Sequence, residues 1–218
     1  MDAVAPTATP DRAKATLRAD AQRNRARVLE AAERLLAERG LDVSMHEIAS
    51  AAGVGVGTIF RRFPTKDDLV ATVVAERLRA LATLARACVE RSEHEPWAAF
   101  AGYFEAAAEQ HVRHRGLIEA IGSEHLAHPM HAEQMASLIG DVATLVERAL
   151  AAGELRAGVT VADIPMLLCA VGRMGQAPSG GDVGEAWRRP CTILLDGMRA
   201  SAATVQLAPG ADWSNTCC

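Results

Sequence analysis

The strongest constraint on the fold is a helix-start signal followed closely by a glycine turn. Ser44 and Glu47 form a capping-box pattern, in which each side chain satisfies a free backbone donor at a helix start. A helix is therefore predicted to begin at about Met45. We expect it to end at Gly53, because glycine adopts the left-handed conformation without steric cost.

A second short helix is predicted directly after this turn. It should begin at about Val56 and end at Pro64, because proline has no backbone donor and restricts the residue before it. Two short helices about a tight turn form a helix-turn-helix. The outward face of the second helix combines small residues with Arg61 and Arg62. This face suits a DNA major groove, where guanidinium groups bind guanine edges or phosphates.

The segment EIASAAGVGVGTIFRRFPTKDDLV resembles the DNA-binding domain of TetR-family transcriptional regulators. The resemblance extends from about Arg23 to Val74 and rests on the helix lengths, the turn and the lysine that follows. It implies an all-α, homodimeric regulator with a helical ligand-binding domain. By resemblance, base edges are approached by Val56, Gly57, Thr58 and Arg61, and phosphates by Ser44, Thr58, Phe60, Arg62 and Lys66, with Gly55 counted in the same set. The family usually has tyrosine at the position of Phe60, so a hydroxyl that commonly bonds a phosphate is absent here.

The glycines and arginines of this segment also fit two other interpretations. Gly53, Gly55 and Gly57 imitate a phosphate-binding glycine loop, but no apolar strand precedes them and the lysine and hydroxyl of such a loop are absent. Arg61 and Arg62 alone could form a solvated helix face. The coincidence of capping box, turn and small outward face favours DNA binding instead.

Composition and pattern predict an all-α chain. Half of the 218 residues are hydrophobic and only 4% are aromatic, and no segment shows the β-branched alternation of strands. We expect a disordered basic arm over 1–19, a helix-turn-helix domain over 20–65, a helical ligand-binding and dimerisation domain over 66–201, and a flexible tail over 202–218.

Charge divides the chain into two unequal parts. Residues 1–79 hold 13 Lys or Arg against 11 Asp or Glu, whereas the remainder holds 10 against 16, although the whole chain carries a net charge of −4. This asymmetry favours a DNA-facing end and a second domain with another role. The start of the chain lacks the apolar core of a signal peptide, and no apolar run is long enough to span a bilayer. We therefore expect a cytoplasmic protein with no membrane partner.

Apolar periodicity predicts the remaining helices. The first runs from about Asp20 to Arg39 and packs behind the helix-turn-helix, and a long helix capped by Thr65 runs from Lys66 to about Arg91 and joins both domains. Further helices are predicted after Pro96, over Leu117–Leu126, from about Met135 to Gly153, from Asp163 to the glycine-rich loop at 175–184, and around Trp187 to Met198, with Pro190 starting or kinking the last one.

Apolar side chains outside the first domain suggest a cavity and an interface. The resemblance implies a ligand pocket, and its candidate lining residues are Trp97, Phe100, Tyr103, Phe104, Ile121, His125, Met166, Leu167 and Met174. The family usually pairs its last two helices across a two-fold axis. The candidate interface residues on these helices are Leu168, Val171, Ile193, Leu194 and Met198.

Histidines and cysteines offer little specific chemistry. Five of seven histidines lie between His111 and His131, but their spacing crosses helix breaks and lacks convincing acidic or cysteine partners. We predict no metal, no cofactor and no catalytic residues, since no nucleophile or paired-carboxylate motif is present. Cys88, Cys169 and Cys191 suit helical core positions, and the Cys217-Cys218 pair suits a solvated tail.

These patterns predict a DNA-binding transcriptional regulator that recognises an inverted-repeat operator on double-stranded DNA as a homodimer. We expect a repressor that a small apolar or aromatic effector releases from DNA. The alternatives are a DNA-binding regulator without small-molecule control, a metal-sensing regulator that uses the histidines, and, in a different class, a helical small-molecule-binding protein or enzyme.

Overall fold

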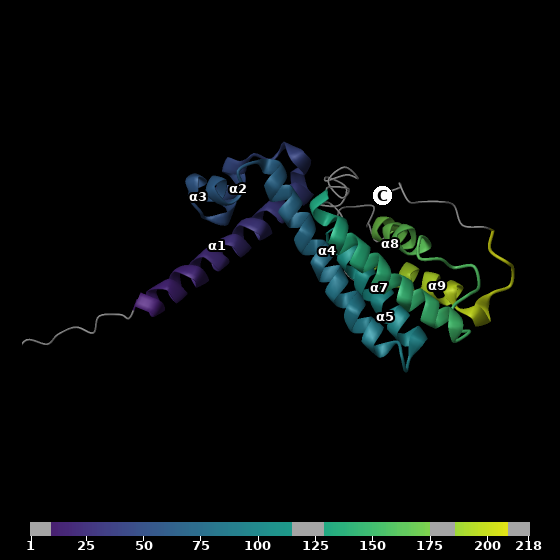
Figure 1. Cartoon of the computed structure of the whole chain (residues 1–218). Coiled ribbons are helices and arrows are strands. Elements are labelled where there is room, and N and C mark those ends of the chain that lie inside the picture. The colour runs from purple at the N-terminus through teal and green to yellow at the C-terminus, as the bar shows by residue number, and fades with distance from the viewer. Residues whose placement is uncertain (1–9, 115–128, 175–185, 209–218) are drawn as a thin grey trace, which may run out of the picture.

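The computed structural model describes residues 10–114, 129–174 and 186–208, and these form eight α-helices with no named strand. The helices are α1 (Pro10–Arg39), α2 (Met45–Ala52), α3 (Val56–Arg62), α4 (Lys66–Arg91), α5 (Pro96–Arg113), α7 (Ala132–Ala151), α8 (Asp163–Met174) and α9 (Arg188–Met198). Figure 1 shows α1, α2 and α3 at one end and the remaining helices gathered at the other, with α4 running between them. The predicted all-α class is confirmed.

The first three helices form a small unit around the start of α4. The side chains of Leu36 on α1, Ile48 on α2, Ile59 on α3 and Leu69 on α4 are all completely buried. Because short helices are marginal on their own, this shared core rather than helix propensity holds α2 and α3 in place.

The long helix α4 connects this unit to the helical body, as the sequence predicted. It has 26 residues, which corresponds to about 39 Å at 1.5 Å per residue. Its first turns bury Leu69 and Val73 against the N-terminal unit, and Ala85 and Cys88 are buried near its other end. Helix α4 therefore contributes buried residues to the core of the N-terminal unit and to the core of the helical body.

Helix α5 lies at the centre of the body. It packs against α4, α7, α8 and α9, and Phe100 and Phe104 on it are fully buried. Pro96 occupies the first turn of α5, where a missing backbone donor costs nothing. The body is thus a bundle built around one apolar helix (Figure 1).

Two sequence expectations need correction, and two others fall outside the described residues. Helix α1 begins at Pro10 rather than near Asp20, because the alanine, leucine and basic residues of 10–19 favour helix without needing an apolar stripe. The predicted mobile tail contacts the body over its first residues, since Arg156 Nη2 donates to the Val205 carbonyl at 2.8 Å and Leu207 is half-buried. The predicted helix 117–126 and glycine-rich loop 175–184 lie outside the described residues.

The remaining helix boundaries agree with the sequence predictions. Helix α4 begins after Thr65 and ends at Arg91, and α8 begins at Asp163. Pro190 lies in the first turn of α9, so it starts this helix rather than kinking it.

Candidate nucleic-acid interface

The start of α2 is fixed by the capping box that the sequence predicted. Glu47 N–H donates to Ser44 Oγ at 3.3 Å, and Ser44 N–H donates to Glu47 Oε2 at 2.8 Å. Arg39 adds an ion pair to the other oxygen of Glu47 at 2.7 Å. The hydrogen bonds from the Ser44 backbone and side chain, together with Arg39, lower the pKa of Glu47 to about 2.

A left-handed glycine ends α2 and sets the turn. Gly53 has a φ of 62°, a conformation that costs other residues strain. Its N–H and that of Val54 return to the Ala49 carbonyl, which Val54 reaches at 3.0 Å. Arg27 on α1 donates to the Gly53 carbonyl at 3.3 Å. The turn is therefore tied to the helix behind it.

Helix α3 presents one buried side and one exposed side. Ile59 is fully buried, and Phe63 after the helix is 4% exposed. Gly57 and Arg61 face solvent, and Arg61 Nη2 donates to Thr58 Oγ1 at 3.3 Å. No side chain crowds Gly57, since a Cβ built there meets nothing within 4 Å. The exposed side therefore combines an open backbone at Gly57 with the exposed guanidinium groups of Arg61 and Arg62.

The predicted DNA-binding residues differ in how available they are. Gly55, Gly57, Phe60, Arg61 and Arg62 are exposed on or beside α3, and Val56 and Thr58 are half-buried.

Besides Thr58, which accepts from Arg61, two of the predicted phosphate-contacting residues already have partners within the chain. The hydroxyl of Ser44 also donates to Glu47 Oε2 at 2.7 Å. Lys66 Nζ donates to the Leu41 carbonyl. A phosphate contact by Lys66 therefore requires this bond to be shared or broken.

His46 is a residue of this surface that the sequence reasoning missed. It is exposed on α2, and its ring meets the ring of Phe60 on α3 edge to face, with centroids 6.0 Å apart. Phe60 itself is 40% exposed. The contact joins two helices and depends on their packing angle, so no local sequence signal could have found it.

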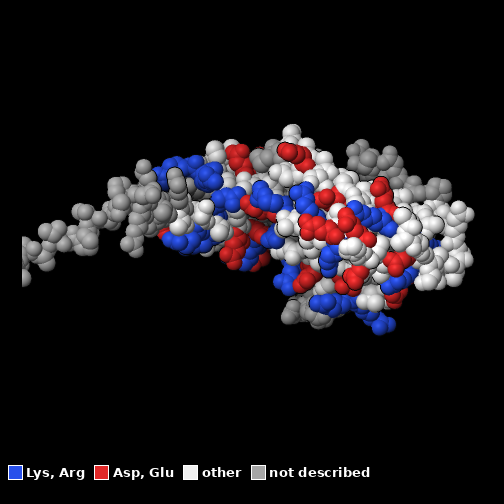
Figure 2. Space-filling view, turned by 60° about the horizontal axis from the view of Figure 1, so that its bottom comes forward, with Lys and Arg blue, Asp and Glu red and all other residues white. Residues whose placement is uncertain are grey.

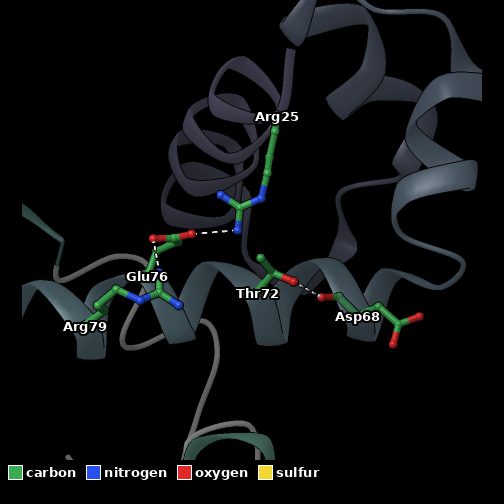
Figure 3. Close-up of polar contacts among 5 residues, drawn as sticks. All are labelled: Arg25, Asp68, Thr72, Glu76 and Arg79. Atoms are coloured by element: carbon green, nitrogen blue, oxygen red, sulfur yellow. Dashed lines mark hydrogen bonds and ion pairs between the residues drawn. The ribbon is translucent and has the colours of Figure 1, made fainter. Parts of the chain in front are cut away.

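A groove of about 310 Å³ opens behind this surface, between α1 and the start of α4. Its lining residues are Arg25, Arg62, Phe63, Pro64, Asp68 and Thr72. Figure 3 shows the polar contacts on one wall, where Arg25 on α1 points to Glu76 on α4 at 2.6 Å and Glu76 also contacts Arg79. The Thr72 hydroxyl donates to the Asp68 backbone carbonyl at 2.7 Å. The groove therefore marks the joint between the N-terminal unit and α4.

The charge on the described surface is unevenly distributed. In the view of Figure 2, blue basic side chains gather towards the left end of the described surface, whereas red and blue alternate over the body. A basic end beside an open helix face suits a polyanion such as DNA.

The predicted pocket residues are only partly described. Trp97, Phe100, Tyr103 and Phe104 are buried on α5, with Trp97 and Phe100 ring centroids 5.7 Å apart. Met166 and Leu167 are half-buried on α8. Ile121, His125 and the Met174 side chain lie outside the described set. The four residues on α5 belong to one apolar core, with Leu167 packed against it. The ligand role of the set stays a prediction.

The predicted interface residues separate into two groups. Leu168, Val171 and Met198 are at most 5% exposed within the single chain, so they stabilise the monomer core. Ile193 is 59% exposed and Leu194 is half-buried on α9. If α9 forms an interface, Ile193 and Leu194 are the members of the set with apolar surface available for it.

The described residues offer neither a metal-ligand cluster nor a membrane span. No group of three or more His, Cys, Asp or Glu side chains that could hold a metal occurs among the described residues. Within the same part of the chain, no helix is long and apolar enough to cross a bilayer. Cys88 and Cys191 are buried free thiols, as expected, whereas Cys169 is disulfide-bonded and was wrongly predicted as a simple core residue.

Two protein-family models together match most of the described chain. The model for bacterial regulatory proteins of the tetR family matches residues 28–73, which span the helix-turn-helix. The model for the C-terminal domain of SbtR-like transcriptional regulators matches residues 95–200.

Individual relatives agree with these matches. A TetR transcription regulatory protein from Mycobacterium vanbaalenii is 34% identical, with 84% of this chain and 99% of that chain covered and a TM-score of 0.58. A TetR transcriptional regulator from Streptomyces coelicolor is 25% identical, with 80% and 98% covered and a TM-score of 0.59. An HTH-type transcriptional regulator of Staphylococcus aureus is 41% identical over 63 residues, which are 28% of this chain and 34% of that protein. The chain thus matches about a third of the length of this curated relative.

Proposed function

Because the chain belongs to the TetR family of DNA-binding transcriptional regulators, we propose that it binds an inverted-repeat operator as a homodimer and represses transcription until a small effector releases it. The observation that carries the proposal is the exposed face of α3. This face presents Arg61 and Gly57, where an added Cβ would meet nothing within 4 Å, on a helix between two others whose starts are fixed by capping boxes.

The exposed face of α3 fits a major groove in shape and in charge. Small residues let a helix approach the bases closely, and an arginine fork recognises the paired acceptors of guanine. Arg61 and Arg62 lie in the last turn of α3 and are both exposed. Arg61 is assigned to base edges and Arg62 to a phosphate.

An inverted repeat follows from dimer symmetry. A two-fold dimer places two copies of α3 in successive major grooves, so each half-site is read in opposite orientation. The exposed side chain of Ile193 on α9 supplies apolar surface for such a dimer.

The proposed effector site lies in the helical body. Trp97, Phe100 and Phe104 form a buried aromatic row on α5, which favours an apolar or aromatic molecule. A ligand that binds more tightly to a body arrangement with low affinity for DNA must weaken DNA binding by the same factor by which DNA weakens ligand binding.

The test begins with duplexes selected from random DNA by the purified protein. We expect a palindromic consensus, binding by a dimer, and an affinity that falls steeply with salt because basic residues displace counterions. Selected sequences without two-fold symmetry would contradict the dimeric reading. Ligands that stabilise the protein against heat and never change its affinity for this duplex would replace the proposal by an unregulated DNA-binding protein.

A further inference from the structure

A charged cluster connects α1 to the helical body at a point beside α4. Glu33 on α1 contacts Arg77 on α4 and Nδ1 of His114, the residue that ends α5. The side chains of Glu33 and His114 are 18% and 20% exposed, and that of Arg77 is 32% exposed. We call Glu33, Arg77 and His114 the three-helix clasp, because each comes from a different helix.

The charge of Glu33 in the three-helix clasp is stabilised by both of its partners. Burial raises the pKa of Glu33, but hydrogen bonds and charge interactions with His114 and Arg77 outweigh this effect and lower the pKa. The carboxylate is therefore charged at neutral pH while largely shielded from water. Removing a partner leaves a half-buried charge short of compensation, which disfavours the clasped arrangement.

The last turn of α5 contacts two helices in opposite units. His111, one turn before His114, is half-buried, and its Nδ1 lies 3.0 Å from the Ala107 carbonyl. Its Cβ lies beside α8, 3.8 Å from the position that a Cβ on Gly172 would occupy. His114 on the same turn contacts Glu33 on α1. A displacement of α8 relative to α5 therefore acts on the turn that holds α1.

We propose that the three-helix clasp is a mechanical connection, additional to α4, through which the helical body sets the orientation of α1 and of the DNA-reading unit packed on it. The inference rests on the proposed function, because the orientation of α1 matters through α3. When the three-helix clasp is formed, α1 is already held in the orientation that binds DNA. No binding free energy is then needed to select this orientation from several others. Releasing the clasp weakens operator binding without touching any DNA-facing residue.

The experiment measures operator affinity of the full chain for three variants at one salt concentration and pH. They are Glu33→Gln, His114→Ala and the double variant, with His94→Ala as a control, because His94 is an exposed histidine before α5 that lies outside the clasp. Each clasp variant should weaken binding at least about fivefold, the lower end of typical coupling between sites. The double variant should lose no more operator affinity than the weaker-binding of the two single variants. His94→Ala should bind the operator like the wild type.

Unchanged or tighter binding by His114→Ala would overturn the inference, and so would losses that multiply in the double variant. Circular dichroism at the assay temperature confirms that each variant is folded. Glu33→Gln keeps the shape of the side chain. If His114→Ala unfolds, the operator affinity of Glu33→Gln therefore decides the test. A wild-type protein that binds no duplex refutes the proposed function, whereas a wild type that binds DNA with clasp variants equal to it refutes the clasp alone.

Discussion

Arg25 on α1 donates from Nη2 to Oε1 of Glu76 on α4 at 2.6 Å (Figure 3). On the adjacent residue of α4, Arg77 contacts Glu33, two turns further along α1. The two pairs have opposite polarity, so sliding α1 along α4 would bring like charges together. The two ion pairs therefore fix the position of α1 along α4, in addition to the apolar packing between these helices. Because α3 belongs to the same unit as α1, this contact also sets the position of α3.

The two glycines of the helix-turn-helix should respond oppositely to alanine. Gly53→Ala forces a side chain into the left-handed conformation, at φ 62°, and should destabilise the protein by about 1–2 kcal/mol. Gly57→Ala lies inside α3 with nothing within 4 Å of the added Cβ. It should stabilise the fold by about 0.5–1 kcal/mol, since alanine loses less backbone entropy, yet weaken operator binding because a methyl group protrudes from the recognition face.

Urea unfolding and operator titration of the same two proteins check this prediction. The matched pair separates backbone conformation from groove contact. Equal stability of the two variants would contradict the assignment of Gly53 as the turn residue, and undiminished operator binding by Gly57→Ala would place this face of α3 away from the bases.

A tyrosine at position 60 should tighten operator binding. Phe60 is 40% exposed beside His46, so a para-hydroxyl can extend toward solvent without enlarging the buried part of the ring. One new hydrogen bond to a phosphate corresponds to about 0.5–1.5 kcal/mol. Titration of Phe60→Tyr against wild type on the selected operator measures the gain, and equal or weaker binding would show that position 60 does not face the DNA backbone.

Stability should depend on Glu47 at acidic pH. The pKa of Glu47 in the folded protein is about 2, below the ordinary value of 4.5. The carboxylate therefore stabilises the fold at pH values above 4.5, and this contribution is lost as the pH falls towards 2. Glu47→Gln removes this contribution. The difference in Tm between wild type and Glu47→Gln should therefore be constant near neutral pH and shrink between pH 4.5 and 2. A difference that does not change over this range would mean that the capping box is not charge-assisted.

Local signals in the sequence predicted the helices around the DNA-facing surface. The capping box of Ser44 and Glu47 forms where predicted, and Thr65, predicted only as a cap, forms a second capping box with Asp68. Gly53 likewise adopts the left-handed conformation that its place after α2 required. Such features depend on one turn of backbone, so the amino-acid order alone specifies them.

Contacts between distant segments could not be predicted in the same way. Lys66 was expected to be free for a phosphate but donates to the Leu41 carbonyl, and the meeting of His46 with Phe60 depends on how α2 packs on α3. The start of α1 was missed for another reason. The residues directly after Pro10 show no apolar periodicity in the sequence, so helix propensity was the only signal there.

The central claim is that the exposed face of α3 reads DNA sequence, and comparing Arg61→Ala with Arg62→Ala tests it most directly. Each is titrated with the selected operator and with a scrambled duplex over a range of salt. Arg61→Ala should lose roughly 1–3 kcal/mol of preference for the operator, whereas Arg62→Ala should weaken both duplexes alike and flatten the salt slope by about 0.9. If both variants retain wild-type preference and wild-type salt slope, α3 does not read the DNA and the account is wrong.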